Sequence, residues 1–229
     1  MPYFFIDYYY IILVIPAMLL AAWAQFKVKS TYNKFSKVDN SRRITGAYAA
    51  QAILTHYGIT DVRIEQTSGK LTDHYDPRSK VIRLSEGVYS STSIAAVGIA
   101  CHEAGHAAQH AENYVPIKIR NSLIPVCNIG SSLGIPLALA GYFFGFEPLI
   151  TVGLLLYSAI ALFQVVTLPV EFNASKRAIV VIGERGLLAD DEVSSAKKVL
   201  SAAAMTYVAS MIVALANLLR LVLRFRRRD

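Results

Sequence analysis

The sequence predicts a mainly α-helical integral membrane protein with about four transmembrane helices and one α+β portion that contains a small sheet. Hydrophobic residues make up 54% of the 229 residues, charged residues only 17%, and the mean hydropathy is +0.41. These values are high for a soluble globular chain. Four segments approach the roughly 20 apolar residues that cross a bilayer as a helix. We therefore expect part of the chain to lie in lipid.

The formal net charge of +7 agrees better with a lipid bilayer as partner than with nucleic acid. The basic residues cluster beside the apolar segments, and no basic helix is interleaved with aromatic residues. Such flanking charges orient membrane proteins against anionic headgroups. The two cysteines, Cys101 and Cys127, are expected to be ordinary buried thiols.

The first apolar segment, from about Phe4 to Phe26, predicts an N-terminal transmembrane anchor over residues 1–26. It opens with an interfacial aromatic cluster, Tyr8-Tyr9-Tyr10, and closes at Lys27 and Lys29. Because it lacks a basic N-terminal region, an uncleaved anchor fits better than a signal peptide.

The second and third segments predict a transmembrane hairpin over residues 122–170. They run from about Leu123 to Phe144 and from about Leu149 to Val170, and only residues 145–148 separate them. Glycines four residues apart, at 130 and 134 and at 141 and 145, would permit close helix approach in lipid. A high general frequency of glycine in such helices explains them equally well.

The fourth segment, from about Ala202 to Leu223, predicts a C-terminal membrane helix with a basic tail over residues 202–229. Its early turns contain Thr206, Tyr207 and Ser210, so they could pack on protein rather than on lipid. A cytoplasmic segment over residues 171–201 is expected before it.

The stretch from residue 27 to residue 121 is the only one large enough for an independent soluble core. A helix is predicted from Asn40 to Tyr57, and short strands at residues 62–65 and 81–84. Thr92 and Ser93 can cap a further helix that ends near Glu112.

The flanking charges predict which side of the membrane each part occupies. Lysines and arginines lie at the ends of the segments that border the soluble portion, whereas the N-terminus and the 145–148 turn have none. The positive-inside rule therefore places the N-terminus outside and the soluble portion in the cytoplasm. Four full crossings would put the arginine-rich tail, 224–228, outside, against the same rule, so the crossing of the fourth segment stays open.

A five-residue motif, His102-Glu103-Ala104-Gly105-His106, indicates the chemistry. Residues four apart on a helix share a face, so His102 and His106 can bind one Zn²⁺ together. Glu103 would lie beside the metal as a general base, taking a proton from the attacking water and delivering it to the leaving amine. Gly105 would let another segment approach the helix closely. A buried helix that uses the two histidines only for hydrogen bonds is the alternative.

A catalytic zinc site needs a third protein ligand, and Glu171 is the best candidate. His110 lies about 12 Å along the helix axis from His102, too far for the same ion, and is expected to be a surface or supporting residue. Glu171 is a lone acid at the end of the third apolar segment, where an ionisable group needs a partner. A solvent-facing carboxylate beside Lys176 and Arg177 is the alternative.

Further polar residues could serve the same site. His74, Tyr75 and Asp76 could line a substrate cleft or donate to an oxyanion, or they could form a polar turn before Pro77. Arg177 and Tyr207 are weaker oxyanion candidates.

Four stretches, residues 71–77, 82–85, 102–107 and 169–175, carry a family resemblance. Through them the chain resembles the bacterial membrane family of neutral zinc metallopeptidases of YugP type, over essentially its whole length. It also resembles, more distantly, the HtpX-type membrane gluzincins, in which E-x-x-A-D supplies the third ligand. Here that motif reads E-x-x-A-S, with Ser175 at the aspartate position, where a hydroxyl would orient a zinc histidine less strongly. The resemblance implies a zincin-like domain, with His102, His106 and Glu171 as zinc ligands and Glu103 as base.

The sequence therefore predicts a multi-pass cell-membrane zinc metalloendopeptidase that cleaves protein or peptide substrates at the cytoplasmic face. A non-proteolytic scaffold or adaptor with a structural zinc is the main alternative, and Cys101 or His74 would be its fourth ligand. A metal transporter is disfavoured because no span carries paired acids or histidines at mid-depth. Membrane protein partners and a homo-oligomer stay open.

Overall fold

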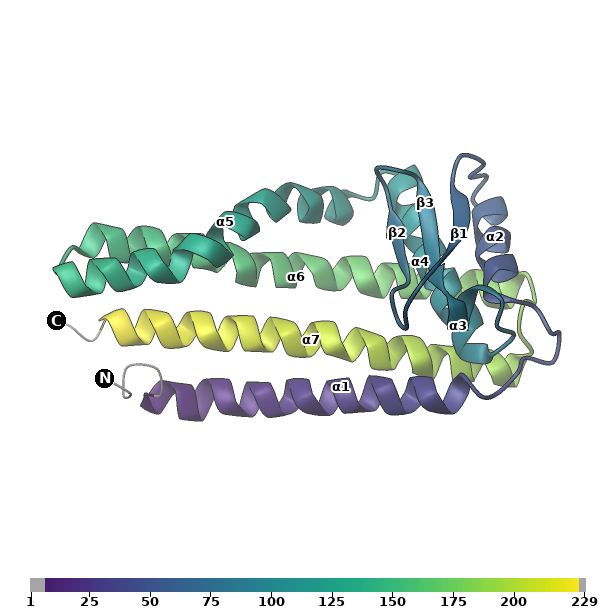
Figure 1. Cartoon of the computed structure of the whole chain (residues 1–229), viewed down its shortest axis with the longest axis horizontal. Helices are drawn as coiled ribbons and strands as arrows, with labels where there is room; N and C mark the ends of the chain where they lie inside the picture. The colour runs from purple at the N-terminus through teal and green to yellow at the C-terminus, as the bar shows by residue number, and fades with distance from the viewer. Residues whose placement is uncertain (1–6, 227–229) are drawn as a thin grey trace. The chain divides into compact units, whose positions relative to one another are not determined.

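The computed structural model describes residues 7–226, and Figure 1 labels its elements. The start of the first predicted span at Phe4 and the last arginines of the tail, 227 and 228, lie outside the described residues. A π-helical turn, Tyr10–Val14, leads into the first helix. The elements are α1 (Ile15–Phe35), α2 (Gly46–His56), β1 (Arg63–Thr67), β2 (His74–Asp76), β3 (Val81–Ser85), α3 (Glu86–Tyr89), α4 (Ile94–Ala111), α5 (Val115–Phe144), α6 (Glu147–Glu184) and α7 (Asp190–Arg226).

Four helical stretches are long and apolar enough to cross a membrane, which confirms the predicted class. They are Tyr10–Phe35, Val115–Phe144, Glu147–Glu184 and Asp190–Phe225, with mean hydropathies of 2.0, 1.7, 2.2 and 2.0 in their most apolar windows. The last two helices extend well beyond the apolar segments, because helix continues through polar sequence on both sides of residues 185–189. The chain is a membrane protein.

Contacts within the chain define two compact units. The first comprises the chain up to Gln25, Lys118–Pro169, and the residues from Met205 onward. In it the α5–α6 pair packs closely: a Cβ at Gly134 would lie 3.1 Å from the Gly153 carbonyl oxygen, and one at Gly141 would lie 2.7 Å from the Ile150 nitrogen. This favours close packing as the reason for Gly130, Gly134 and Gly141. Gly145 instead has a positive φ of 69°, and a Cβ there would meet nothing within 4 Å.

The second unit comprises Phe26–Ile117 and Val170–Ala204 and contains the sheet. The strand order is β1-β3-β2; β1 pairs with β3 in parallel and β2 pairs with β3 antiparallel. The central strand β3 is buried at Val81, Ile82 and Leu84, whereas β1 is more exposed. The two strands predicted from alternation are therefore present, and β2 is a third.

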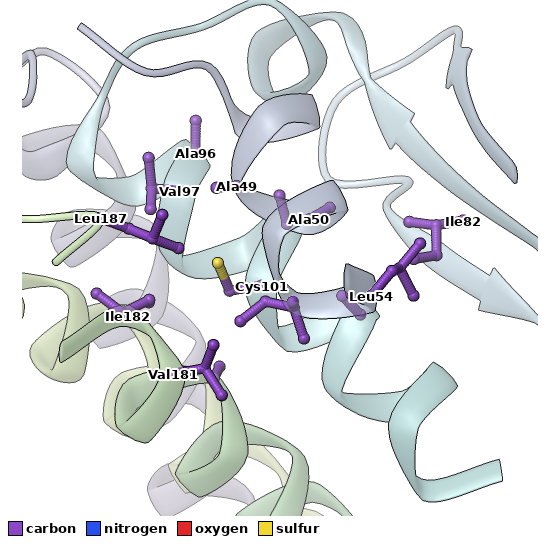
Figure 2. Close-up of a cluster of buried hydrophobic side chains, with 14 of the residues drawn as sticks. Ala49, Ala50, Leu54, Ile82, Ala96, Val97, Cys101, Val181, Ile182 and Leu187 are labelled. Atoms are coloured by element: carbon purple, nitrogen blue, oxygen red, sulfur yellow. The ribbon is translucent and has the colours of Figure 1, made fainter. Parts of the chain in front are cut away.

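The core of the second unit forms where α2 packs on α4 (Figure 2). Small residues, Ala49 and Ala50 on α2 and Ala100 and Ala104 on α4, are fully buried and let the two helices approach. Residues from the end of α6, the turn after it and the start of α7 complete this core, among them Val181, Ile182, Leu187 and Ala196. The core fixes α4 from several sides.

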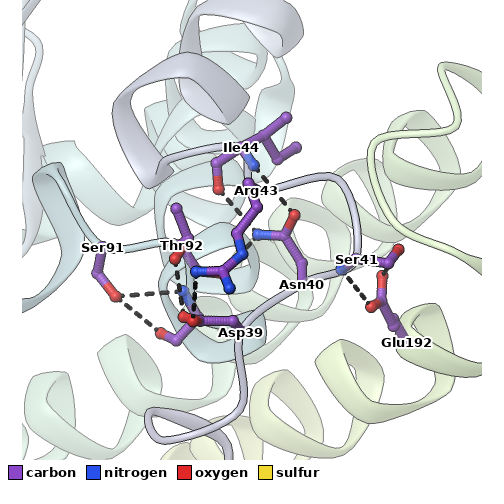
Figure 3. Close-up of polar contacts among 9 residues, drawn as sticks. Asp39, Asn40, Ser41, Arg43, Ile44, Ser91, Thr92 and Glu192 are labelled. Carbon is purple, nitrogen blue, oxygen red and sulfur yellow. Dashed lines mark hydrogen bonds and ion pairs between the residues drawn. The ribbon is translucent and has the colours of Figure 1, made fainter.

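The predicted helix from Asn40 to Tyr57 is wrong at its start, since α2 begins only at Gly46. The buried Asn40 amide instead donates to the Ile44 and Thr92 carbonyls and accepts from the Ile44 amide (Figure 3). An asparagine that binds backbone in this way competes with helix formation. Thr45 then caps α2 by accepting from the Tyr48 amide.

The start of α4 is as predicted. Ser93 has extended backbone, and its hydroxyl accepts from the Ala96 amide. This cap satisfies one of the free amides of the first turn. The helix then runs without a break through the histidine motif.

Candidate metal centre

The two motif histidines present their rings from one face of α4. The ring centroids of His102 and His106 are 4.7 Å apart, and the ring planes lie at 80° to each other. Their side chains are 15% and 12% exposed, so the site is sheltered but open to solvent. The i, i+4 spacing therefore produces the predicted pair.

Glu171, on α6, faces both histidines. Its Oε2 lies 3.3 Å from His102 Nε2 and 3.6 Å from His106 Nε2, and its side chain is only 5% exposed. Within residues 7–226, these three form the one group of three or more potential metal ligands, with ligand atoms within 4.8 Å of one another. The structure thus brings together the three residues singled out as ligands.

The donor set and its spacing fit zinc. Two imidazole nitrogens and one carboxylate oxygen are the composition of many catalytic zinc sites. Tetrahedral bonds of zinc length place neighbouring ligand atoms about 3.3 Å apart. The two measured nitrogen-to-oxygen separations, 3.3 and 3.6 Å, lie close to that value.

The other ring nitrogens are held by side chains outside the group. His102 Nδ1 lies 3.1 Å from Ser175 Oγ, and His106 Nδ1 lies 3.0 Å from Gln109 Oε1. Ser175 therefore takes the orienting position that the E-x-x-A-S motif suggested. With both Nδ1 atoms engaged, both Nε2 atoms face Glu171.

Gly105 allows α6 to approach α4 at this point. A Cβ at residue 105 would lie 2.7 Å from the carbonyl oxygen of Ala174 and 3.3 Å from its Cα. Because Glu171 and Ser175 flank Ala174 on α6, this backbone contact sets the distance of both from the histidines. The segment that Gly105 allows to approach α4 is therefore the backbone of α6 at Ala174.

The electrostatics of the centre favour positive charge. Burial lowers the pKa of His106, but the hydrogen bond to Glu171 and the negative charges of Glu103 and Glu171 together raise it by more. The pKa of His106 therefore lies above its ordinary value. Glu103 is half-buried. Glu103 is not in the ligand group, and its charge is one of those that raise the pKa of His106.

The remaining predicted residues lie around the centre or away from it. The His110 ring lies against the Tyr75 ring, with centroids 5.5 Å apart and planes tilted by 60°. His74 is exposed, with Nδ1 2.8 Å from the Thr72 carbonyl oxygen, so it is not in the ligand group. Asp76 accepts from the Arg78 amide and the Ser79 hydroxyl, which hold its pKa at about 2. His74, Tyr75 and Asp76 form strand β2 rather than a polar turn. Asp76, the last residue of the strand, also stabilises the turn that follows through these two hydrogen bonds.

Arg177, Cys101 and Tyr207 are the other candidates named from the sequence. The Arg177 guanidinium donates to Glu112 Oε2 at 2.7 Å and to Asn173 Oδ1 at 2.7 Å. Cys101 is fully buried in the apolar core (Figure 2), which raises the pKa of its thiol, and it is not in the ligand group. Tyr207 belongs to the first unit.

Sequence reasoning missed Gln109 and Asn173. Gln109 lies three residues after His106 and is fully buried. A glutamine next to a motif histidine on the buried face of a predicted helix was the available signal, because buried amides require partners. Asn173 lies within the 169–175 stretch but was assigned no role there.

Two comparisons with known proteins identify the family of the chain. The model of a family described as "Putative neutral zinc metallopeptidase" matches residues 10–226. The chain belongs to this family. It is also 49% identical over 216 residues to "Putative membrane protease YugP" of Bacillus subtilis (strain 168), covering 94% of this chain and 96% of that protein. No solved structure matches the chain.

Proposed function

We propose that this protein is a zinc metalloendopeptidase of gluzincin type that hydrolyses peptide bonds of protein substrates at the cytoplasmic face of the membrane. The observation that supports it most is the convergence of His102 Nε2 and His106 Nε2 on one oxygen of Glu171, at 3.3 and 3.6 Å. A carboxylate brought by a different helix to an H-E-x-x-H pair is the ligand arrangement of that class. The family membership agrees with it.

In this proposal each residue has one role. His102, His106 and Glu171 hold the zinc, which when bound supplies a Lewis acid that polarises the scissile carbonyl. Glu103 takes a proton from the attacking water and passes it to the leaving amine. Ser175 keeps the His102 ring in place from its far side.

The cytoplasmic location is supported by the charges that flank the spans. Lys27, Lys29, Lys118 and Lys176 border the unit that contains the motif. Within the first unit, Asp7 Oδ2 lies 3.2 Å from Arg220 Nε and 3.9 Å from Arg224 Nε. This pairing brings the end of α7 to the start of the first span and offsets the charge of two arginines there, which supports four full crossings.

Labelling of a single cysteine tests the location. Leu71, in the loop between β1 and β2, is 55% exposed. In a Cys127→Ser background, Leu71→Cys should react with a membrane-impermeant maleimide only after the cells are opened. Reaction in intact protoplasts would place the motif unit outside.

The activity is tested with Glu103→Gln. Purified in detergent, the wild type should carry about one zinc per chain and cleave casein or peptides. Glu103→Gln should keep its zinc and lose about 10²- to 10⁴-fold in kcat. Glu184→Gln, an exposed glutamate of α6, is the matched control and should behave like the wild type.

Two outcomes would contradict the proposal. Cleavage by Glu103→Gln at the wild-type rate would remove Glu103 as base. A zinc-loaded wild type that cleaves nothing would favour the scaffold with a structural zinc, for which the fourth ligands considered, Cys101 and His74, lie outside the ligand group.

A further inference from the structure

Gln109 is a fully buried amide whose two ends have different partners. Its Oε1 lies 3.0 Å from His106 Nδ1. Its Nε2 donates to the Val170 carbonyl oxygen at 2.7 Å and to Asn173 Oδ1 at 3.0 Å. One side chain of α4 thus connects a motif histidine to the turn of α6 that contains Glu171.

The direction of this amide follows from chemistry. The Val170 carbonyl oxygen can only accept a hydrogen bond, so the Gln109 atom that faces it must be the NH₂ group. The amide oxygen then faces His106 and can only accept, so the hydrogen in that contact belongs to Nδ1 of His106. An amide turned the other way would set two acceptors against each other at 2.7 Å.

Asn173 is fixed in the same manner. Arg177 Nε can only donate, and it meets Asn173 Oδ1 at 2.7 Å, so the oxygen of Asn173 also faces Gln109. Arg177 is itself held by Glu112, 2.7 Å away, and its guanidinium lies over the Tyr57 ring at 5.5 Å. The orientation at His106 therefore depends on a chain of contacts that ends at an ion pair.

We propose that Gln109 is a positioning residue that selects the tautomer of His106 with the hydrogen on Nδ1. In that tautomer the lone pair of Nε2 points toward Glu171 and is available to the metal. The inference rests on the proposed zinc site, and it does not depend on peptide cleavage.

The two motif histidines differ in whether their hydrogen-bond partner selects a tautomer. Ser175 Oγ, the partner of His102, can donate or accept by rotating its hydroxyl, so it orients the ring without selecting a tautomer. Gln109 cannot reverse without losing two hydrogen bonds. His106 is therefore the histidine with the fixed metal-facing nitrogen.

The test compares zinc-loaded variants in detergent by zinc dissociation constant, from chelator competition, and by ¹⁵N NMR of the histidine rings. In the wild type, His106 Nδ1 should give a protonated signal that exchanges slowly with water, and Nε2 a metal-bound signal. Gln109→Met should weaken zinc binding about 10- to 100-fold and lose the slowly exchanging Nδ1 hydrogen. Gln51→Met, on the exposed face of α2, is the matched control and should change neither.

A second pair of variants separates positioning from general stability. Asn173→Asp keeps an acceptor for Gln109 and Arg177, so zinc affinity and the Nδ1 signal should stay close to those of the wild type. Asn173→Leu removes that acceptor and should reduce the protection of the Nδ1 hydrogen, even if the protein unfolds at the same temperature.

The zinc-affinity and NMR results test the role of Gln109 separately from the cleavage assay, which tests the proposed function. Wild-type zinc affinity together with an unchanged Nδ1 signal in Gln109→Met would overturn the inference, as would an unprotonated Nδ1 in the zinc-loaded wild type. A zinc-loaded protein that shows the expected signals but cleaves nothing would contradict the proposed function alone. A wild type that binds no zinc would overturn both.

Discussion

The backbone of Ala174 lies against Gly105, so closely that a Cβ on residue 105 would stand 2.7 Å from the Ala174 carbonyl oxygen. Gly105 lies between the motif histidines, and Ala174 lies between Glu171 and Ser175. One helix contact therefore sets how far the carboxylate and the hydroxyl stand from the imidazoles. It makes packing and metal affinity depend on each other.

Gly105→Ala should destabilise the protein and weaken zinc binding. The new methyl group must move backbone rather than a flexible side chain, and such overpacking costs about 1–3 kcal/mol. Gly98→Ala, on the same helix, is the matched control, because its Cβ would meet Ala196 Cβ at an ordinary 3.6 Å. Thermal unfolding and zinc content measure both variants. Equal behaviour of the two would show that the close contact does not matter.

Glu171→Ala should lose most of its zinc. In the proposed site the carboxylate supplies one of three ligands, and its removal would leave two imidazoles, fewer than catalytic zinc sites use. Metal analysis after gel filtration is the measurement, with Glu184→Ala on the same helix as control. If Glu171→Ala retained a full complement of zinc, Glu171 would not be a ligand.

Ser175→Ala should reduce zinc affinity by about tenfold, because the Nδ1 of His102 loses its partner at 3.1 Å. Ser175→Asp should bind zinc at least as tightly as the wild type, since a carboxylate is a stronger acceptor for the ring hydrogen. Ser158→Ala is the matched control, because the Ser158 hydroxyl bonds only within α6, to the Leu155 carbonyl. Chelator competition ranks the variants. An affinity of Ser175→Ala equal to that of the wild type would contradict the orienting role.

The stability gained from zinc should increase with pH. In the metal-free protein the raised pKa of His106 contributes stability that is fully present below the unfolded pKa, about 6.5, and lost as pH rises through the folded pKa. Zinc requires the neutral ring, so its contribution grows over the same range.

Unfolding temperatures of zinc-loaded and chelator-treated protein, measured from about pH 6 to pH 8, check this expectation. The difference between them should widen with pH. Glu171→Ala should show almost no difference at any pH. If this difference in unfolding temperature became smaller with increasing pH in the wild type, the expected direction of the pH dependence would be wrong.

The class of fold and the three converging side chains follow from the sequence because they depend on local patterns. Apolar runs identify the spans, and the four-residue spacing of His102 and His106 fixes one face of a helix. Glu171 was recognisable because a lone acid at the end of an apolar span needs a partner.

The features that sequence reasoning missed depend on contacts between distant segments. The helix predicted from Asn40 begins only at Gly46, because the Asn40 side chain bonds to the Thr92 carbonyl, far along the chain. Gln109 is polar on a buried face, and its partners on the distant helix α6, Val170 and Asn173, explain it. The strand β2 is three residues long and is stabilised by pairing with β3, which no short pattern encodes.

The order of the ligands along the chain has a consequence for biosynthesis. His102 and His106 leave the ribosome before α5 and the apolar part of α6, and Glu171 follows them. If the proposed zinc site is correct, a nascent chain that still lacks this hairpin has two of the three ligands, together with Glu103. The centre could then be completed only after the α5–α6 hairpin has been made, which would keep a shorter nascent chain inactive.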